Sequence, residues 1–190
     1  MSQLEIDALT SAFVMIDLQR GIVARDTAPH PSSVVVANCA RIAERFRAAG
    51  GLVVAVRVSF AEDRADMLCP PNDAPPLPPP PQGWDELVAE TGPHDRDLLI
   101  TKHQWGAFYG TELDLQLRRR GIRTFVIGGI STNFGVESTA RDGWERGYAV
   151  VFAEDAMAGL SSGAHEFAVS TIFPRLGRVR STEEIVAAIR

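Results

Sequence analysis

Short apolar runs alternate along this chain with longer segments that carry the start and stop signals of helices. The first run, Ala12 to Leu18, is almost continuously apolar, which is typical of a strand buried on both faces of a parallel sheet. The segment from 31 to 49, with Pro31 at its start and Gly50 beyond its end, predicts a helix. Because strands that alternate with helices form parallel sheets with right-handed crossovers, this pattern predicts an α/β fold.

The alternation continues through the rest of the chain. Further strands are expected at 52–59, 98–101, 123–129, 148–153 and 178–180. Further helices are expected at 111–120, at 133–146 and at 163–173, the last of which should end at Pro174. Ser181, Thr182, Glu183 and Glu184 form a capping-box pattern that predicts one more helix. We therefore predict a three-layer αβα sandwich with a mostly parallel, doubly wound sheet of about six strands, as one domain over residues 1–190.

The segment from Pro70 to Gly83 holds eight of the twelve prolines of the chain. Proline removes a backbone donor, so this segment can form neither a helix nor a central strand and is expected to be extended. Long loops in compact domains usually carry a function. A lid or an intersubunit arm is favoured over a ligand for proline-binding modules, and an inert surface loop stays open as an alternative.

The composition excludes several classes of function. Hydrophobic residues make up 45% of the chain and charged residues 23%, which is typical of a folded protein. The net charge of -5 gives no basic surface for nucleic acid, no apolar run is long enough to cross a bilayer, and no signal peptide is evident. Two cysteines, Cys39 and Cys69, make no disulfide framework. We expect a cytoplasmic protein whose partner is a small molecule rather than nucleic acid or a membrane.

Candidate catalytic groups follow the strands at their carboxyl ends. Asp17 ends the first strand, Lys102 follows the third, and the turn from Gly128 to Gly135 joins the fourth strand to its helix. Ligands of open parallel sheets bind beyond these ends. Lys102 is the one lysine among 19 basic residues, which indicates either a place that needs a compact, desolvatable ammonium or chance drift at a surface site. A charge in a buried strand needs a partner, so Asp17 and Lys102 are expected to pair, either as a structural ion pair or as a proton-transfer pair. The crevice position favours the second.

Taken together, these segments resemble the isochorismatase-like hydrolases, also called the cysteine hydrolase family. The matching segments are Met15 to Gln19, Lys102 with Gly106 to Phe108, Gly129 to Asp142, and Glu154 to Ala156. The resemblance covers nearly the whole chain, except the proline-rich region and the extreme termini. It implies an active site made of an aspartate, a lysine and a cysteine. Asp17 and Lys102 match the first two, but the nucleophile position falls on Gly135, as in the branch that includes the isochorismatases proper. The family also has a cis peptide bond that would fall at Ile130–Ser131.

This resemblance suggests hydrolysis of a vinyl ether without a nucleophilic side chain. Asp17 would donate a proton, and Lys102 would set its charge state and orient the substrate. Further contacts with substrate or water are expected from Gln19, Trp105, Phe108, Ile130, Ser131, Thr132 and Asn133. Because Thr132 and Asn133 resemble the amidase side of the family, isochorismate is one candidate substrate among several. Relatives commonly assemble as dimers or larger, so a homo-oligomer is expected.

Two alternative classes of protein remain for this sequence. A catalytically inactive binding or scaffold protein would explain the missing thiol, and a nucleotide-binding domain is disfavoured because the glycine-rich turn matches no phosphate motif.

The Gly-x-Ser-x-Gly match from Gly159 to Gly163 lacks a following aspartate and is interpreted as accidental. The histidines are scattered, and the segment 58–63 lacks the histidine of the metal-binding nicotinamidase relatives. We therefore predict no catalytic metal and no cofactor. The histidines are His30, His94, His103 and His165.

Overall fold

A computed structural model describes residues 4–68, 70–74 and 78–190. Its strands form one parallel sheet in the order β3-β2-β1-β4-β5-β6. This arrangement confirms the predicted doubly wound sheet. The strands are β1 (Ser11–Ile16), β2 (Leu52–Val58), β3 (Leu98–Lys102), β4 (Thr124–Ile130), β5 (Ala149–Ala158) and β6 (Gly177–Arg180).

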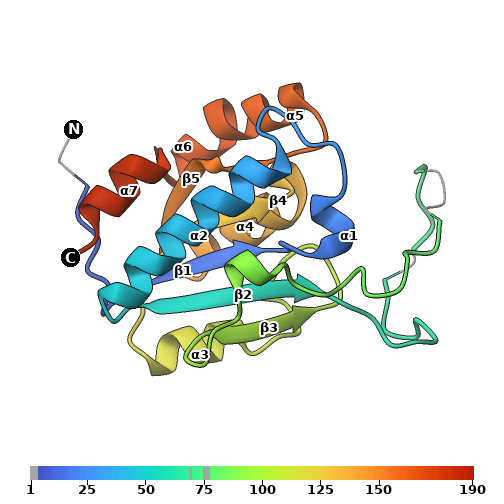
Figure 1. Cartoon of the computed structure of the whole chain (residues 1–190), viewed down its shortest axis with the longest axis horizontal. Coiled ribbons are helices and arrows are strands. Elements are labelled where there is room, and N and C mark those ends of the chain that lie inside the picture. The colour runs from blue at the N-terminus through green and yellow to red at the C-terminus, as the bar shows by residue number, and fades with distance from the viewer. Residues whose placement is uncertain (1–3, 69, 75–77) are drawn as a thin grey trace.

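Helices cover both faces of the sheet and make the three predicted layers (Figure 1). The helices are α1 (Arg20–Val23), α2 (Ser32–Ala48), α3 (Leu113–Arg119), α4 (Glu137–Glu145), α5 (Ser162–Phe167), α6 (Phe173–Leu176) and α7 (Thr182–Ala188). Shorter turns are η1 (Ala89–Thr91), η2 (Thr132–Val136) and η3 (Ala168–Ile172), of which η2 and η3 have π-helical bonding. Phe13 and Met15 pack with α2 and α7 on one face, whereas Val14 and Ile16 pack with α3, α4 and α6 on the other. None of the helices in the described residues is long and apolar enough to span a membrane.

Two predicted boundaries are wrong. β5 runs on to Ala158 rather than ending at Ala153, because the acids Glu154 and Asp155 are accommodated inside the strand. Asp155 accepts hydrogen bonds from the backbone N–H and the hydroxyl of Thr182 and so holds the start of α7. Pro174 does not end a helix but lies in the first turn of α6, where a missing backbone donor does no harm. The capping box between Ser181 and Glu184 is present as predicted.

The order of strands places a switch point between β1 and β4. The chain builds outward from β1 to β2 and β3, and then returns to the other side of β1 with β4. Crevices at such points are where open α/β sheets bind ligands. Gly129 permits β1 and β4 to approach here, because it has a φ of +120° and a Cβ atom would lie 2.2 Å from the carbonyl oxygen of Ile16. The switch point therefore opens directly after Ile16, at Asp17.

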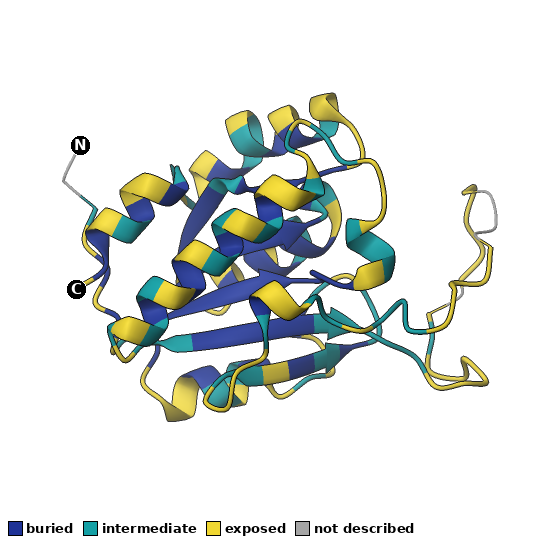
Figure 2. Cartoon of the chain, in the orientation of Figure 1, coloured by how far each residue is buried: buried dark blue, intermediate teal, exposed yellow. Residues whose placement is uncertain are grey.

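The proline-rich segment lies on a long excursion between β2 and β3. Figure 1 shows the chain leaving the body of the molecule near the carboxyl end of β2, and Figure 2 shows that this excursion is largely exposed. The described parts of the segment, 70–74 and 78–83, form no helix or strand, as its prolines predicted. We refer to residues 59–84 as the arm.

Candidate active site

Asp17 directly follows the last residue of β1, at the switch point of the sheet. Its backbone N–H still donates to the carbonyl of Val56 at 2.9 Å, so the residue is anchored to β2. Its φ of 53° lies in the left-handed region, which aspartate tolerates better than most residues. Only 8% of its side chain is exposed. The carboxyl group is therefore held in a fixed place, out of bulk water.

Lys102 is the last residue of β3, and its side chain reaches across the end of β2 to Asp17. Its Nζ lies 2.7 Å from Oδ2 of Asp17 and 2.6 Å from the carbonyl oxygen of Trp105. The lysine side chain is 1% exposed. The structure thus brings together the two charged residues that the sequence predicted to meet, and it satisfies the ammonium from two sides.

The protonation of Asp17 is poised near neutral pH. Burial raises the pKa of Asp17 to about 6, although the charge and the hydrogen bond of Lys102 act in the opposite direction. Among the described residues, the second carboxyl oxygen, Oδ1, is buried without a hydrogen-bond partner. An unpaired buried oxygen is costly, so this atom is the natural place for a proton, a water or a substrate atom.

Gly135 lies against the acid–amine pair. A Cβ atom at this position would be 3.1 Å from Oδ2 of Asp17 and 3.3 Å from Nζ of Lys102. It would also be 2.8 Å from Cγ2 of Ile16, closer than Cβ atoms are found in practice. The glycine therefore places no side chain against the pair, where any larger residue would stand against it.

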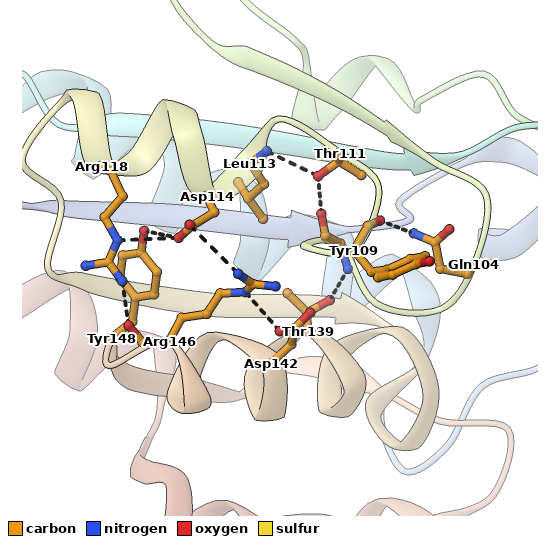
Figure 3. Close-up of polar contacts among 11 residues, drawn as sticks. Gln104, Tyr109, Thr111, Leu113, Asp114, Arg118, Thr139, Asp142, Arg146 and Tyr148 are labelled. Carbon is orange, nitrogen blue, oxygen red and sulfur yellow. Dashed lines mark hydrogen bonds and ion pairs between the residues drawn. The ribbon is translucent and has the colours of Figure 1, made fainter.

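Thr139 ties Gly135 to the loop that follows Lys102, and the sequence analysis missed it. Its hydroxyl donates to the carbonyl of Gly135 at 2.6 Å, one helical turn back, and accepts from the N–H of Ala107 at 3.1 Å. Figure 3 shows Thr139 beside this loop. The hydroxyl of Thr111 donates to the carbonyl of Ala107 at 2.5 Å. Gln104 donates to the carbonyls of Gly106 and Tyr109 within the same loop. The only available signal was a threonine four residues after a glycine in a helix.

Trp105 and Phe108, the two aromatic residues predicted to contact substrate, lie in different surroundings. Trp105 is 62% exposed, and its ring packs edge-on against Phe134, with the ring centroids 4.9 Å apart. Phe108 does not line the site, because it is buried in the core between Phe125 and Tyr148. The aromatic residue that packs beside Trp105 is instead Phe134, one residue before Gly135.

Gln19 has a structural role in place of the predicted contact with substrate. Its amide oxygen accepts from the N–H of Val58 and its amide nitrogen donates to the carbonyl of Val58, both at 2.8 Å. The residue is completely buried. Val58 is paired in register with Lys102, so Gln19 fixes the strand end from which the lysine projects.

The turn after β4 contains two fully buried residues and two half-buried residues. The cis peptide bond expected at Ile130–Ser131 is present. Ile130 is buried in the core, and Thr132 is buried with its hydroxyl 2.9 Å from Nδ1 of His165. Ser131 and Asn133 are half-buried, and Oδ1 of Asn133 has no partner in the described part of the chain. Ser131 and Asn133 are therefore the two of these four turn residues that are not fully buried.

Two of the histidines are not scattered in the folded chain. His30 and His165 lie edge to face with ring centroids 5.7 Å apart, and both approach Glu154.

Ser161 of the Gly-x-Ser-x-Gly match caps α5 by accepting a hydrogen bond from the N–H of Ala164, which gives it a structural role.

The fold and the Asp17–Lys102 pair define a three-layer α/β protein with a buried acid and amine at the switch point of its sheet. The family model described as the isochorismatase domain matches residues 11–184. The chain is 50% identical over 187 residues to the uncharacterized isochorismatase family protein YecD of Escherichia coli O157:H7, covering 98% of this chain and 100% of the relative. It is 46% identical over 193 residues to the uncharacterized isochorismatase family protein YwoC of Bacillus subtilis strain 168, covering all of both chains.

A solved structure agrees with these relatives. The structure of an isochorismatase family protein from Burkholderia thailandensis superimposes with a TM-score of 0.93 at 44% identity, covering 98% of each chain. The chain therefore belongs to the isochorismatase family of hydrolases, as the sequence analysis expected.

Proposed function

We propose that this chain hydrolyses a small, carboxylate-bearing metabolite by acid catalysis from Asp17 and without a cysteine nucleophile. Hydrolysis of a vinyl ether of the isochorismate type is the leading candidate. The observation that carries the proposal is the state of Asp17: one oxygen is bound to Lys102, the other has no partner among the described residues, and burial raises its pKa to about 6.

The proposed reaction begins with transfer of a proton from Asp17 to the terminal carbon of the vinyl ether. The resulting oxocarbenium ion takes up water, and the hemiketal so formed loses a proton and collapses to a ketone and an alcohol. Asp17 becomes an anion in the first step, and the adjacent ammonium of Lys102 stabilises that anion. The exposed Trp105 and its neighbour Phe134 supply apolar surface beside the crevice.

Covalent catalysis of the amidase type lacks a nucleophile here. Gly135 has no side chain to attack a carbonyl. Cys39 cannot replace it, because its thiol is buried in the core, donates to the carbonyl of Ala156, and has its pKa raised by burial. Cys69 lies outside the described residues. These facts favour a reaction in which water is the nucleophile.

The direct test is turnover of isochorismate by the purified protein beside an Asp17→Asn variant. General acid catalysis contributes roughly 10²–10⁴-fold, so the variant should lose at least about a hundredfold in rate. Asp95→Asn removes an exposed carboxylate that precedes the start of β3, whereas Lys102 lies at the end of that strand, and it should leave the rate unchanged. Equal rates for wild type and Asp17→Asn would remove Asp17 from the mechanism.

The alternative is a family member that binds a small molecule and has lost its chemistry. It predicts thermal stabilisation by carboxylate ligands together with no turnover across a panel of vinyl ethers and amides. The acid–amine pair speaks against this alternative, because a buried pair of charges is seldom the most stable way to fill such a space.

A further inference from the structure

Three side chains from distant parts of the sequence converge behind the η2 turn. His30 comes from the loop before α2, Glu154 from within β5 and His165 from α5. Nε2 of His30 lies 3.1 Å from Oε1 of Glu154, and Nε2 of His165 lies 3.4 Å from the same oxygen. One ligand atom from each of the three lies within 4.8 Å of the others. The proposed hydrolysis uses none of these residues.

The spacing of these atoms suits a transition-metal ion. Zinc binds histidine nitrogen and carboxylate oxygen at about 2.0–2.2 Å, so neighbouring ligand atoms of a tetrahedral site lie about 3.4 Å apart. The two distances to Glu154 are close to that value. Two imidazoles and one carboxylate select zinc and its neighbours over magnesium or calcium, which prefer oxygen ligands alone.

The surroundings of His165 also fit a metal ligand. Its Nδ1 lies 2.9 Å from the hydroxyl of Thr132, and the residue is buried. Histidines that bind metals generally use the second ring nitrogen in such a hydrogen bond, which fixes the ring and turns the other nitrogen to the ion. Here that other nitrogen is Nε2, the atom that faces Glu154.

The remaining two side chains give the cluster charge and access. Glu154 supplies a carboxylate oxygen, which is the anionic ligand of the cluster. About a quarter of the His30 side chain and a third of the Glu154 side chain are exposed, which leaves a path for an ion and for water ligands.

We propose that His30, Glu154 and His165 form a binding site for one divalent cation of the zinc class, with water completing its coordination. The site is separate from the Asp17–Lys102 pair. It is connected to the η2 turn through the contact between His165 and Thr132, so an ion bound here would hold that turn from behind.

The test is titration of chelator-treated protein with zinc, and separately with magnesium, by isothermal titration calorimetry. We expect one equivalent of zinc to bind and magnesium to give no saturable heat. Loss of His30 in His30→Ala should weaken zinc binding by at least about tenfold, and Glu154→Gln should do the same. His94→Ala removes an exposed histidine outside the cluster and should bind as wild type does.

Cobalt(II) supplies a second readout, because visible absorption bands of a tetrahedral nitrogen and oxygen site should appear in wild type and be lost in His30→Ala. Circular dichroism of the metal-free variants checks their folding, and Glu154→Gln carries the test if His30→Ala is misfolded. Zinc binding that is absent from wild type, or equal in wild type and both cluster variants, overturns the proposal. These measurements do not involve turnover, so they stand apart from the outcome for the proposed hydrolase activity.

Discussion

The ammonium of Lys102 lies 2.7 Å from one carboxyl oxygen of Asp17, although 85 residues separate the two in the chain. An opposite charge this close would normally lower the pKa of an aspartate well below 4. Burial outweighs that effect here and raises the pKa to about 6. Asp17 is therefore an acid that still holds its proton in part of the molecules at neutral pH, which is what a proton donor requires.

The first prediction is that activity rises as the pH falls through about 6. The proposed mechanism needs protonated Asp17, and the fraction in that form increases as the pH drops toward and below its pKa. Above that point kcat/KM should fall by about tenfold per pH unit. The measurement is a pH profile with the vinyl-ether substrate from about pH 5 to about pH 8. A rate that instead increases with pH across this range would show that Asp17 acts as a base.

The second prediction concerns Lys102→Met. Lys102 lowers the pKa of Asp17 by its charge and its hydrogen bond, so removing it should raise that pKa further. The midpoint of the pH profile should move up by about one unit or more, even where the maximal rate declines. Arg96→Met, which removes an exposed cation, should leave the midpoint in place. An unchanged midpoint in Lys102→Met would mean that the lysine does not control the acid.

The sequence could predict that Asp17, Lys102 and the turn from Gly128 to Gly135 lie together because one general rule brings them to the same place, and the family resemblance then singled out Gly135 within that turn. Parallel strands deliver the residues that follow them to the same edge of the sheet, so chain order alone brings an acid, an amine and a turn to one crevice. The roles given to Gln19 and Phe108 were wrong for a different reason. Residue type does not say in which direction a side chain points, and these two point to Val58 and into the core.

The histidine cluster could not be predicted from spacing. His30 and His165 are far apart in sequence, and Glu154 directly follows the expected end of the strand at residue 153. Only the pairing of β5 with β4 and the position of α5 bring the three side chains together. Thr139 was missed likewise, since its value depends on the loop at Ala107, which the helix pattern does not reveal.

The third prediction tests the arm as a contact with a second copy of the chain. Leu68 in the arm is 66% exposed, and a large apolar side chain in this position is favourably buried by another protomer. Leu68→Glu should therefore shift the mass measured by light scattering from an oligomer toward a monomer. Leu9→Glu alters a leucine that is 69% exposed and precedes β1, so it serves as a matched control without effect. A monomeric wild type would exclude the intersubunit role and leave the lid or the inert loop.

The fourth prediction is a loss of stability in Thr139→Val. The valine has a similar shape but can neither donate to the carbonyl of Gly135 nor accept from the N–H of Ala107. The free energy of unfolding in urea should fall by about 1–3 kcal/mol, because both buried backbone groups lose their partner. Thr139→Ser keeps the hydroxyl and should therefore keep most of the free energy of unfolding of the wild type. A free energy of unfolding of Thr139→Val equal to that of wild type would show that the two hydrogen bonds do not stabilise the fold.

The fifth prediction returns to the residue that faces the pair. A cysteine in Gly135→Cys would start from a Cβ atom 3.1 Å from Asp17 and 3.3 Å from Lys102, and the adjacent ammonium should lower the pKa of its thiol. Alkylation by iodoacetamide at neutral pH should therefore be faster at position 135 than at the buried Cys39.

Activity separates the effect of the thiol from the effect of added bulk. Gly135→Ala and Gly135→Cys should both lose vinyl-ether hydrolysis, since either side chain stands against the acid, whereas amide hydrolysis should appear only with the cysteine. The new Cβ atom would lie 2.8 Å from Cγ2 of Ile16, so Ile16→Ala combined with Gly135→Cys relieves that contact and should increase any gain. If position 135 reacts no faster than Cys39 even in the double variant, Lys102 does not act on this position, and the geometry that supports the proposed chemistry is wrong.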